Sequence, residues 1–279
     1  MRILVTGHRG YIGGHLLNQL IEMGHVAVGI DLKEGESILC DLEKFENLKP
    51  EYIFHLAAFP SVQQSVESPS FVLENNVLGT SRVLEFAKKV RAKRVIFSSS
   101  AAINGNGEGP INPYGLHKLM SEQECKLYSE LYDLDTVCLR YFNVYSGDQT
   151  ANGPYSTVMA AWMGCLQTNQ PLRIEGDGEQ KRDFIHVGDI VDANIFCMER
   201  EEAFCGSHYD VGTGNNYSLN EIKSFVMKNY SNVEFVTLPD RPGDAKDSLA
   251  DIEPLKKLGW QSKISFEEGL QECFLKKGD

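Results

Sequence analysis

The chain has 279 residues, 42% of them hydrophobic and 24% charged, which is enough for one large or two small domains with a sizeable core. Its formal net charge of −12, without any cluster of lysines and arginines, argues against nucleic acid or an anionic membrane surface as a partner. Seven scattered cysteines without a Cys-x-x-Cys pair, and the lack of a run of 18 apolar residues, predict a soluble cytoplasmic protein with reduced thiols and no metal site.

The first predicted elements surround a set of glycines. The apolar run Ile3–Val5 fits a buried parallel strand, and Gly7, Gly10 and Gly13 follow it at intervals of three. An apolar-periodic helix over Ile12–Met23 begins inside this spacing. A strand, a glycine turn and a helix in this order form a cradle for a pyrophosphate, which faces the free N–H groups at the start of the helix.

The second apolar run, Val26–Ile30, ends in Asp31. A carboxylate there would accept hydrogen bonds from an adenosine ribose and oppose a 2′-phosphate, which favours NAD over NADP; a solvated turn residue is the alternative. The segment Ser37–Asp41 is predicted to be a short third strand ending in an acid. Asp41 and Leu42 could flank an adenine, and Asp41 could also cap the helix that begins at Leu42.

The fourth predicted strand is Tyr52–Ala58, whose last two alanines leave space for something flat to pass. His55 within it is interpreted as a core histidine rather than a catalyst. A long helix is predicted over Pro69–Val90. It contains the pair Asn75 and Asn76, which are poor helix formers, so one amide turned toward a ligand or exposure to solvent would explain their place.

The fifth strand, Arg94–Ser98, leads into three serines that would lie at the carboxyl edge of the sheet, where ligands bind in doubly wound folds. A loop rich in Gly and Asn over Ala101–Asn112, a helix over Pro113–Tyr132 and a sixth strand over Thr136–Arg140 follow. This alternation predicts an α/β fold with a Rossmann-type, doubly wound parallel sheet and helices on both of its faces.

Beyond residue 145 the pattern loosens, and we expect a smaller C-terminal α/β lobe over the carboxyl edge of the sheet. We therefore predict a dinucleotide-binding domain over residues 1–145, completed by later segments, and a mainly substrate-binding lobe over 146–279. The elements expected in this lobe are a helix over Thr157–Gln167, strands over Leu172–Ile174, Phe184–Val187 and His208–Val211, and a helix over Asp189–Arg200.

Tyr114 and Lys118 lie four residues apart, so they share one face near the start of a predicted helix. The lysine ammonium and the helix dipole both favour the ionised phenol, which could take a proton from an alcohol while a hydride leaves the same carbon for nicotinamide. Ser100 could hydrogen-bond and orient the alcohol oxygen. The pair has weight because it follows the serines and the glycine turn; elsewhere such a pair is usually surface decoration.

Two arginines stand out in the C-terminal lobe, Arg182 beside a strand and Arg241 before a Pro-Gly turn. A pair of guanidinium groups suits a diphosphate, which each can bind in bidentate fashion. Salt bridges to Asp183 or Asp244 are the alternative for either arginine alone.

Short motifs of one kind recur along nearly the whole chain. They are Thr6-Gly-x-x-Gly-x-x-Gly13, Asp31, Asp41-Leu42, His55-Leu-Ala-Ala58, Asn75-Asn-Val-x-Gly-Thr80, Phe97-Ser-Ser-Ser100, Tyr114-x-x-x-Lys118, Arg140-Tyr-Phe-Asn143, Gly176-Asp-Gly through Arg182-Asp-Phe184, and Arg241-Pro-Gly-Asp244. Together they resemble the extended short-chain dehydrogenase/reductases that act on nucleotide sugars, and most closely the UDP-hexose 4-epimerases.

The resemblance implies a role for each matching position. Tyr114 is expected to be the base, Lys118 its pKa partner and a ribose ligand, and Ser100 the hydroxyl that aligns the substrate. The expected cofactor contacts are Gly7, Gly10, Tyr11, Ile12, Gly13, Asp31, Asp41, Leu42, Leu56, Ala57, Ala58, Asn75, Tyr114, Lys118 and Phe142. The expected nucleotide-sugar contacts are Ser100, Asn143, Arg182, Arg241 and Ser248.

The implied reaction moves a hydride from sugar C4 to bound NAD, lets the 4-keto sugar turn over, and returns the hydride to the opposite face. Ala101-Ala102 follows Ser100, where the family's 4,6-dehydratases carry an Asp-Glu pair and its decarboxylases a glutamate, which favours an epimerase. Ser248 stands at the family's gate position, and its small side chain resembles relatives that accept a C2 N-acetyl group. The short loop before Tyr114, and Ser146-Gly147 in place of a common Gly-Pro, change the substrate cleft.

Two other functions compete with the epimerase. A 4-keto-sugar reductase would share Ser100, Tyr114 and Lys118 but would need exchangeable NAD(P)H. A non-catalytic dinucleotide sensor is disfavoured by the intact catalytic residues. The helices Asn75–Val90 and Tyr114–Tyr132 resemble the family's dimer-forming pair, so the resemblance implies a homodimer.

Overall fold

A computed structural model describes residues 1–151, 157–239 and 246–275. Its internal contacts divide the chain into two compact units. The first comprises Met1–Tyr141 and Ile190–Asp210, and the second comprises Phe142–Asp189 and Val211–Asp279. Among the described residues, no helix is both long and apolar enough to cross a membrane.

The first unit is built on a six-stranded sheet with the strand order β2-β1-β3-β4-β5-β9. The first five strands in this order pair in parallel, and β9 completes the sheet. The strands are β1 (Arg2–Thr6), β2 (Val26–Ile30), β3 (Tyr52–His55), β4 (Arg94–Ser100), β5 (Asp135–Tyr141) and β9 (Ser207–Val211). The chain runs from β1 outward to β2 and then returns to β3, so the order reverses between β1 and β3. Such a switch point is where doubly wound sheets bind ligands.

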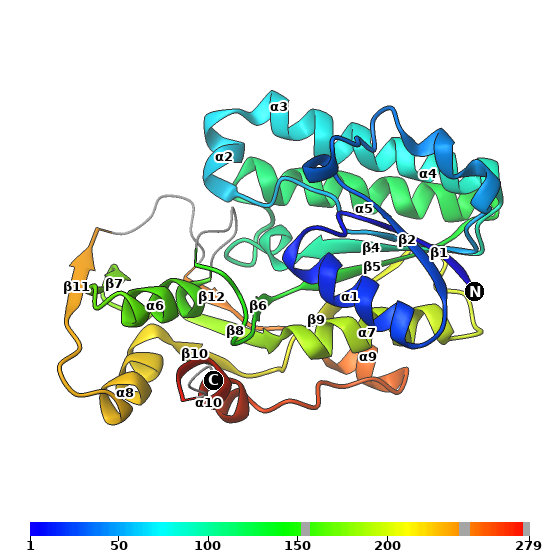
Figure 1. Cartoon of the computed structure of the whole chain (residues 1–279). Helices are drawn as coiled ribbons and strands as arrows, with labels where there is room; N and C mark the ends of the chain where they lie inside the picture. Colours follow the sequence, from blue (N-terminus) through cyan, green and yellow to red (C-terminus); the bar gives the residue numbers. More distant parts are fainter. Residues whose placement is uncertain (152–156, 240–245, 276–279) are drawn as a thin grey trace. The chain divides into compact units, whose positions relative to one another are not determined.

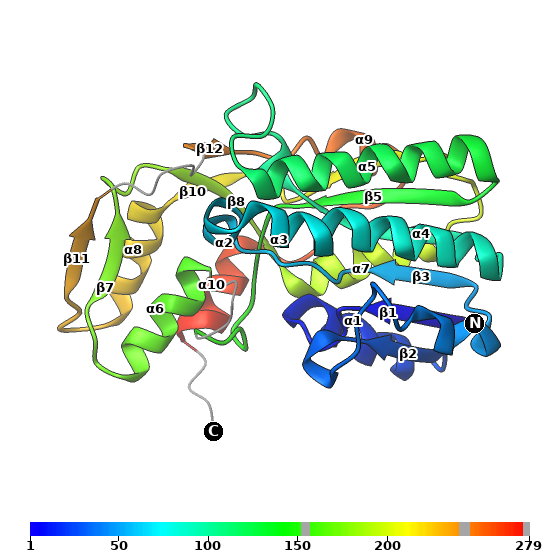
Figure 2. The same cartoon turned by 90° about the horizontal axis from the view of Figure 1, so that it is seen from above.

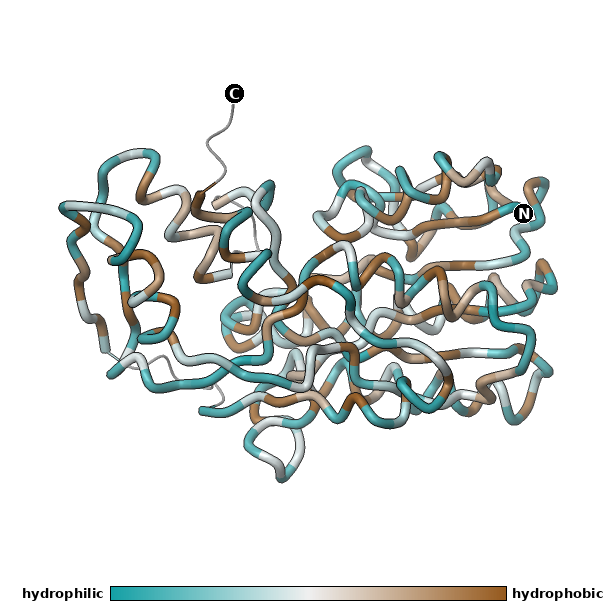
Figure 3. The backbone as a smooth tube through the Cα atoms, turned by 90° about the horizontal axis from the view of Figure 1, so that it is seen from below, coloured by the Kyte–Doolittle hydropathy of each residue, from teal (hydrophilic) through white to brown (hydrophobic). Residues whose placement is uncertain are grey.

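Helices cover both faces of this sheet (Figures 1 and 2). Helices α4 (Gly79–Val90) and α5 (Pro113–Tyr132) lie on one face, and α1 (Tyr11–Glu22) and α7 (Val187–Glu199) lie on the other. The central strands are almost wholly buried, as parallel strands covered on both sides must be. Figure 3 colours the backbone by hydropathy, and hydrophobic stretches alternate with hydrophilic ones along the chain.

The predicted helix over Pro69–Val90 is present but not uniform. Helix α2 (Val62–Glu67) precedes it, α3 (Pro69–Leu73) begins it, and a π-helical turn (Glu74–Leu78) joins α3 to α4. The short 3-10 segments of this unit are Leu32–Glu34, Leu42–Leu48 and Ala101–Ile103. Prediction of one even helix missed the π turn, which hides one extra residue inside a helical pattern.

The expected strand at Ser37–Asp41 is wrong, because this segment is a turn. The backbone N–H groups of Cys40 and Asp41 both donate to the carbonyl oxygen of Ser37, and the Asp41 carboxylate accepts the N–H of Ser37 at 2.6 Å. These hydrogen bonds close the segment on itself, and it pairs with no strand of the six-stranded sheet. Its apolar residue Ile38 is buried against the core instead.

The second unit contains a small mixed sheet around β8 (Lys181–His186). Strand β10 (Asn216–Ser218) pairs with β8 in antiparallel fashion, whereas β6 (Asn143–Tyr145) and β12 (Asp247–Ser248) pair with it in parallel. Strands β7 (Leu172–Glu175) and β11 (Phe235–Leu238) form a separate parallel pair. The helices are α6 (Val158–Gln167), α8 (Leu219–Asn229), α9 (Glu253–Lys257) and α10 (Phe266–Phe274), and aromatic rings from β6, β8 and α10 pack in its core.

Candidate functional site

The glycine turn between β1 and α1 is too tightly packed for side chains. Gly7 has φ +77°, and a Cβ there would lie 2.7 Å from the Ala57 nitrogen; a Cβ on Gly13 would lie 2.2 Å from the Gly7 oxygen. Helix α1 begins after Gly10 with no side-chain cap and no acidic residue in its first turn. The first turn, which includes half-buried Tyr11 and Ile12, therefore presents a positive potential that favours an anion beside the backbone.

Asp31 follows β2 and is held against the glycine turn. One carboxylate oxygen accepts the N–H of Arg9 at 2.8 Å, and the other accepts the N–H of Lys33 at 2.9 Å. The Lys33 ammonium donates to the Arg9 carbonyl at 2.8 Å, and the Arg9 guanidinium donates to Glu34 at 2.6 Å. Each Asp31 oxygen retains a second lone pair, so the residue is a capping group and can also accept a ribose hydroxyl.

Asp41 and Leu42 are placed differently from what a simple cap requires. Asp41 precedes the 3-10 segment Leu42–Leu48, but its side chain makes no capping bond there. The N–H of Ser37 and the thiol of Cys40 hydrogen-bond to its carboxylate and lower the pKa of Asp41. Leu42 is buried in the hydrophobic core of this unit.

At the end of β3, His55 belongs to a buried chain of hydrogen bonds. Thr80 Oγ1 donates to the Asn76 carbonyl, so it accepts from His55 Nε2 at 3.0 Å. His55 Nδ1 then accepts from the Thr6 hydroxyl at 2.8 Å, and Thr6 Oγ1 accepts the N–H of Ala57 at 3.1 Å. Burial lowers the pKa of His55 to about 3, so its ring is neutral. The interpretation of His55 as a core residue is confirmed.

The two asparagines of the π turn are buried rather than exposed to solvent. The Asn76 amide accepts the N–H of Phe59 at 2.8 Å and donates to the Phe59 carbonyl at 3.0 Å. Asn75 Nδ2 lies 3.2 Å from the same Asn76 oxygen. The turn thus fixes the loop after β3, in which the cofactor candidates Leu56, Ala57 and Ala58 are half-buried.

Tyr114 and Ser100 lie at the start of α5 and the end of β4. Asn112 caps α5 by accepting the N–H of Gly115 at 2.9 Å, and the N–H of Tyr114 donates to Ser65 Oγ at 3.1 Å. Ser100 Oγ accepts the N–H of Ala102 at 3.2 Å, which leaves its own proton available to another acceptor. Both side chains therefore belong to one end of the same unit.

Lys118 is buried one helical turn after Tyr114. Its ammonium donates to the Ser98 carbonyl at 2.6 Å and lies 4.7 Å from the centre of the Phe97 ring and 5.9 Å from that of Tyr114. Burial lowers the pKa of Lys118 to about 8, while the Glu122 carboxylate opposes this shift. The predicted shared face of Tyr114 and Lys118 is therefore present.

Three described substrate candidates meet around β8 in the second unit. Asn143 on β6 lies opposite Phe184 on β8 in the strand register, and the Asn143 amide donates to the Asp183 carbonyl at 3.0 Å. Arg182 pairs in register with Ser248 on β12, so their side chains lie on the same face of this small sheet. Phe142, the remaining cofactor candidate, is buried, and Arg241 lies outside the described residues.

The suggested salt bridge between Arg182 and Asp183 is not what holds the Asp183 carboxylate. Asp183 is fully buried and accepts the N–H groups of Thr213 at 2.8 Å, Gly214 at 2.9 Å and Ala250 at 3.3 Å. Burial raises the pKa of Asp183, and these donors oppose the change. Asp183 thus joins β8 to the segments that contain Thr213 and Ala250, and Ala250 lies two residues after Ser248.

The sequence patterns do not predict two side chains that the structure brings to the candidate site, Ser65 and Glu122. Glu122 follows Tyr114 and Lys118 at the same interval of four, which was a usable signal for a third buried position on α5. No local pattern pointed to Ser65, because its contact with Tyr114 joins distant segments. Asn76 belongs to the pair for which the sequence suggests a ligand or solvent, but its amide is buried and bonds the Phe59 backbone, a contact that depends on the π turn.

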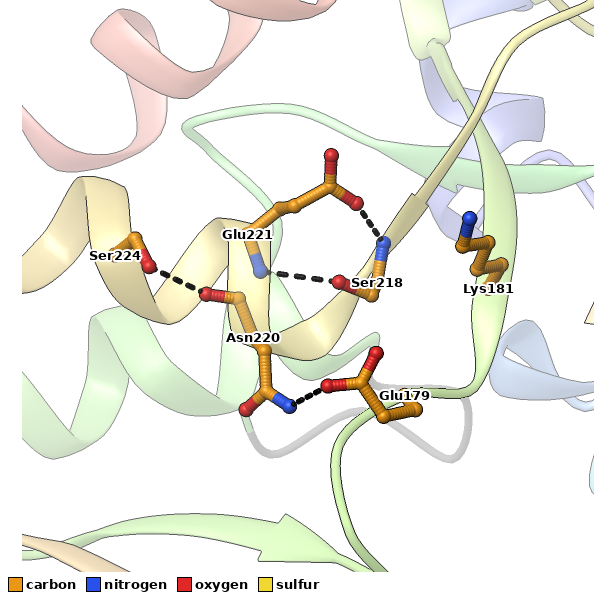
Figure 4. Close-up of a pocket in the computed structure, with 6 residues that line it drawn as sticks. All are labelled: Glu179, Lys181, Ser218, Asn220, Glu221 and Ser224. Carbon is orange, nitrogen blue, oxygen red and sulfur yellow. Dashed lines mark hydrogen bonds between the residues drawn. The ribbon is translucent and has the colours of Figure 1, made fainter.

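Two further observations delimit the site. A surface pocket beside α8 is lined by polar residues that mostly bond one another, including the capping pair Ser218 and Glu221 and the Asn220 amide on Glu179 (Figure 4). It contains none of the predicted site residues. Within the described part of the chain, no group of three or more His, Cys, Asp or Glu side chains is placed to hold a metal ion.

Comparison with known proteins places this arrangement in a family. The model of the NAD dependent epimerase/dehydratase family matches residues 3–212. The UDP-glucose 4-epimerase of Mycolicibacterium smegmatis is 33% identical over 97% of this chain and 96% of its own length.

Two solved structures are similar over almost the whole chain. The UDP-glucose 4-epimerase of Thermotoga maritima, solved with UDP-glucose, has a TM-score of 0.89 and 32% identity over 99% of this chain and 97% of that one. The UDP-N-acetylglucosamine 4-epimerase of Methanobrevibacter ruminantium, solved with UDP-N-acetylmuramic acid, has a TM-score of 0.88 and 34% identity over 98% and 97%. The chain therefore belongs to the NAD-dependent epimerase/dehydratase family and is an NAD-dependent enzyme of its nucleotide-sugar epimerase group.

Proposed function

We propose that this protein is a UDP-sugar 4-epimerase in which Tyr114 is the catalytic base. The observation that carries the proposal is the buried Lys118 ammonium, which is fixed on the Ser98 carbonyl and lies 5.9 Å from the centre of the Tyr114 ring. A positive charge at that distance, in a site with little water, favours the ionised phenol. Ala101 and Ala102, which follow Ser100, supply no further acid or base, which supports epimerisation over dehydration or decarboxylation.

Each residue then has a defined task. Tyr114 takes the proton of the sugar C4 hydroxyl and later returns it, and the Ser100 hydroxyl donates a hydrogen bond to the same oxygen. Lys118 keeps the phenol acidic and binds a ribose hydroxyl. NAD bound in this site would supply the hydride acceptor and donor for C4. Because the oxidised NAD would be restored at the end of each cycle, the enzyme would need no added reductant.

The NAD contacts are assigned to the first unit and the start of the second. The glycine turn (Gly7, Gly10 and Gly13) and the first turn of α1 are assigned to the pyrophosphate, because the glycines carry no side chains and α1 begins with no side-chain cap and no acidic residue. Asp31 accepts the adenosine ribose hydroxyls. The remaining assigned contacts are Tyr11, Ile12, Asp41, Leu42, Leu56, Ala57, Ala58, Asn75, Tyr114, Lys118 and Phe142.

Residues of the second unit bind the nucleotide sugar. We assign Arg182 and Arg241 to the diphosphate and Asn143 to the nucleotide sugar. Arg182 lies on β8, and Asn143 lies on β6, which pairs with β8. In domain terms, we assign the dinucleotide to residues 1–145, whose sheet is completed by Ser207–Val211, and the substrate mainly to residues 146–279, with Ser100 and Asn143 as contributions from the earlier segment.

The substrate proposal is that N-acetylhexosamines can enter. Ser248 pairs with Arg182 on adjacent strands, so its small side chain lies on the same face of the sheet as the arginine. Ser248→Tyr should abolish turnover of UDP-N-acetylhexosamine and preserve turnover of UDP-hexose, with Ser248→Ala as a control that keeps both. Equal loss of both activities in Ser248→Tyr would refute this assignment.

The epimerase proposal is tested with the purified protein and no added cofactor. Denaturation should release NAD, and NMR should show each of a pair of C4-epimeric UDP-sugars converting into the other. A 4-keto-sugar reductase would instead be inactive until NAD(P)H is added and would consume it. No interconversion of any UDP-sugar by protein that contains NAD would overturn the proposal.

We further propose that two copies associate through α5. Leu116, Met120, Leu127 and Leu131 are exposed along one stripe of this helix, at a spacing typical of helix–helix contacts. Sedimentation should show a dimer, and Leu127→Glu should shift it toward a monomer. A monomeric unmodified protein at micromolar concentration would exclude this partner.

A further inference from the structure

Three buried residues follow one another at intervals of four on α5. Tyr114, Lys118 and Glu122 are each no more than 9% exposed. Lys118 donates to the backbone carbonyl of Ser98 at 2.6 Å, and the next residue, Ser99, donates its hydroxyl to Glu122 at 2.6 Å. Two consecutive serines therefore fasten two consecutive turns of the helix.

Glu122 is also held from the neighbouring strand. Arg140 on β5 donates to one Glu122 oxygen at 2.9 Å and to the other at 2.7 Å, which is the bidentate geometry of a strong arginine–carboxylate pair. Ser99 and Arg140 lie opposite each other in the register of β4 and β5. A carboxylate with three such donors has a single orientation, unlike a surface counterion.

We propose that Glu122 is a positioning residue for the reaction. Its carboxylate, held by Arg140 and Ser99, keeps the Lys118 ammonium charged beside Tyr114. The proposal rests on the proposed function, since it needs Lys118 to act on Tyr114. Glu122 does not contact substrate or cofactor in this scheme, and it acts only through Lys118.

The charges around Lys118 support this role. Burial lowers the pKa of Lys118, and Glu122 provides the largest opposing effect. Without Glu122, the nearby Arg140 would be left as an uncompensated positive charge, and its repulsion would favour the neutral amine further. The titratable groups that face Lys118 are Tyr114, Glu122 and Cys125 on its own helix, His55 on β3 and Cys138 on β5. His55 is neutral, and a hydrogen bond with Cys125 together with burial raises the pKa of Cys138, so Glu122 has the largest effect in favour of the charged Lys118.

The same two strands provide a matched control. Arg94 and Asp135 form a second buried ion pair at the opposite end of β4 and β5, also in register. Asp135→Asn and Glu122→Gln each replace one buried carboxylate of an arginine pair by an amide. The two variants differ in position: Glu122 lies one helical turn from Lys118, whereas Asp135 lies at the opposite end of β4 and β5.

The first measurement follows the Lys118 ammonium directly. NMR of protein labelled at the lysine side chains is recorded against pH without substrate, and Lys118→Arg identifies the signal. We expect a midpoint of about 8 in the unmodified protein. It should fall by about one pH unit in Glu122→Gln and stay in place in Asp135→Asn. An unchanged midpoint in Glu122→Gln would overturn the proposal.

The second measurement is the pH profile of epimerisation. Turnover needs charged Lys118, so activity is lost as the pH rises through the Lys118 pKa. In Glu122→Gln this alkaline limb should move to lower pH by a similar amount with little change in KM, whereas Asp135→Asn should keep the limb and lose only thermal stability. If Glu122→Gln does not fold, the double variant with Arg140→Met removes both charges and should still lower the midpoint. Absence of epimerisation in the unmodified protein would end the proposed function alone, since the NMR titration still decides whether Glu122 controls Lys118.

Discussion

Strands β4 and β5 carry a buried arginine–carboxylate pair at each end, and the two pairs hold different things. At the amino end, Arg94 bonds Asp135 and donates to the carbonyl groups of Cys197, Arg200 and Glu202. At the carboxyl end, Arg140 bonds Glu122 on a helix, one turn from Lys118. The first pair therefore ties backbone segments to the sheet, and the second orients side chains that can do chemistry.

The difference fits the general division of labour in doubly wound sheets, where ligands bind at the carboxyl ends of the strands. The same pair of residue types serves stability at one end and reactivity at the other, because the neighbours differ. Variants at the two ends should therefore separate activity from stability, and the following predictions probe that separation.

The largest effect is expected at the site end. Tyr114→Phe removes only the phenol oxygen, so kcat should fall by about 10²- to 10⁴-fold, as for loss of a general base, while the melting temperature stays nearly unchanged. Tyr128→Phe on the same helix is the control and should retain turnover. Full turnover by Tyr114→Phe would contradict its role as base, and full biological activity without turnover would favour a dinucleotide sensor.

The next effect belongs to the scaffold end. Arg94→Met leaves Asp135 and three backbone carbonyl groups without their partner, so the free energy of unfolding should fall by about 3–5 kcal/mol. The kcat of the molecules that remain folded should match that of the unmodified protein. Arg82→Met, which breaks an exposed pair with Glu85, should cost no more than about 1 kcal/mol. A large loss of kcat in folded Arg94→Met would erase the distinction between the two ends.

A smaller effect concerns His55, the last residue of β3, which lies opposite Phe97 in the middle of β4. Its pKa is lowered to about 3 in the folded chain, so below the ordinary histidine pKa of about 6.5 the unfolded chain binds a proton that the folded one refuses. The His55 contribution to stability is complete above about pH 6.5 and is lost as the pH falls below it, by at most about 1.4 kcal/mol per pH unit. Urea unfolding at pH 7 and 5.5 should show a flatter pH dependence in His55→Gln. Equal slopes in both proteins would argue against a buried neutral ring.

Much of the first unit could be predicted because its strands and helices carry strong local patterns. The run Ile3–Val5, the glycine turn and the helix after it need no long-range information, and Tyr114 and Lys118 share a face by spacing alone. The predicted strand at His208–Val211 exists, but its place beside β5 depends on pairing between segments far apart in the chain.

The predictions from sequence fail where contacts outside the local residue pattern determine the conformation. Ser37–Asp41 looked like a strand by its residue types, yet the Asp41 carboxylate closes it into a turn. The π turn at Glu74–Leu78 escaped notice because a single extra residue scarcely alters a helical pattern. The bidentate contact of Glu122 with Arg140 joins a helix to a strand, and a one-dimensional pattern holds no record of it.

The π turn has a consequence for the length of this chain. Because it holds one residue more than an α-helical turn, deleting a residue there would let α3 and α4 merge into one regular helix. Every residue before the deletion would then rotate by about 100° relative to those after it, and the Asn76 amide would leave the Phe59 backbone. A shorter and more regular helix would thus release the loop after β3, so a gain in helix regularity here should be accompanied by loss of the conformation of the proposed cofactor contacts Leu56, Ala57 and Ala58.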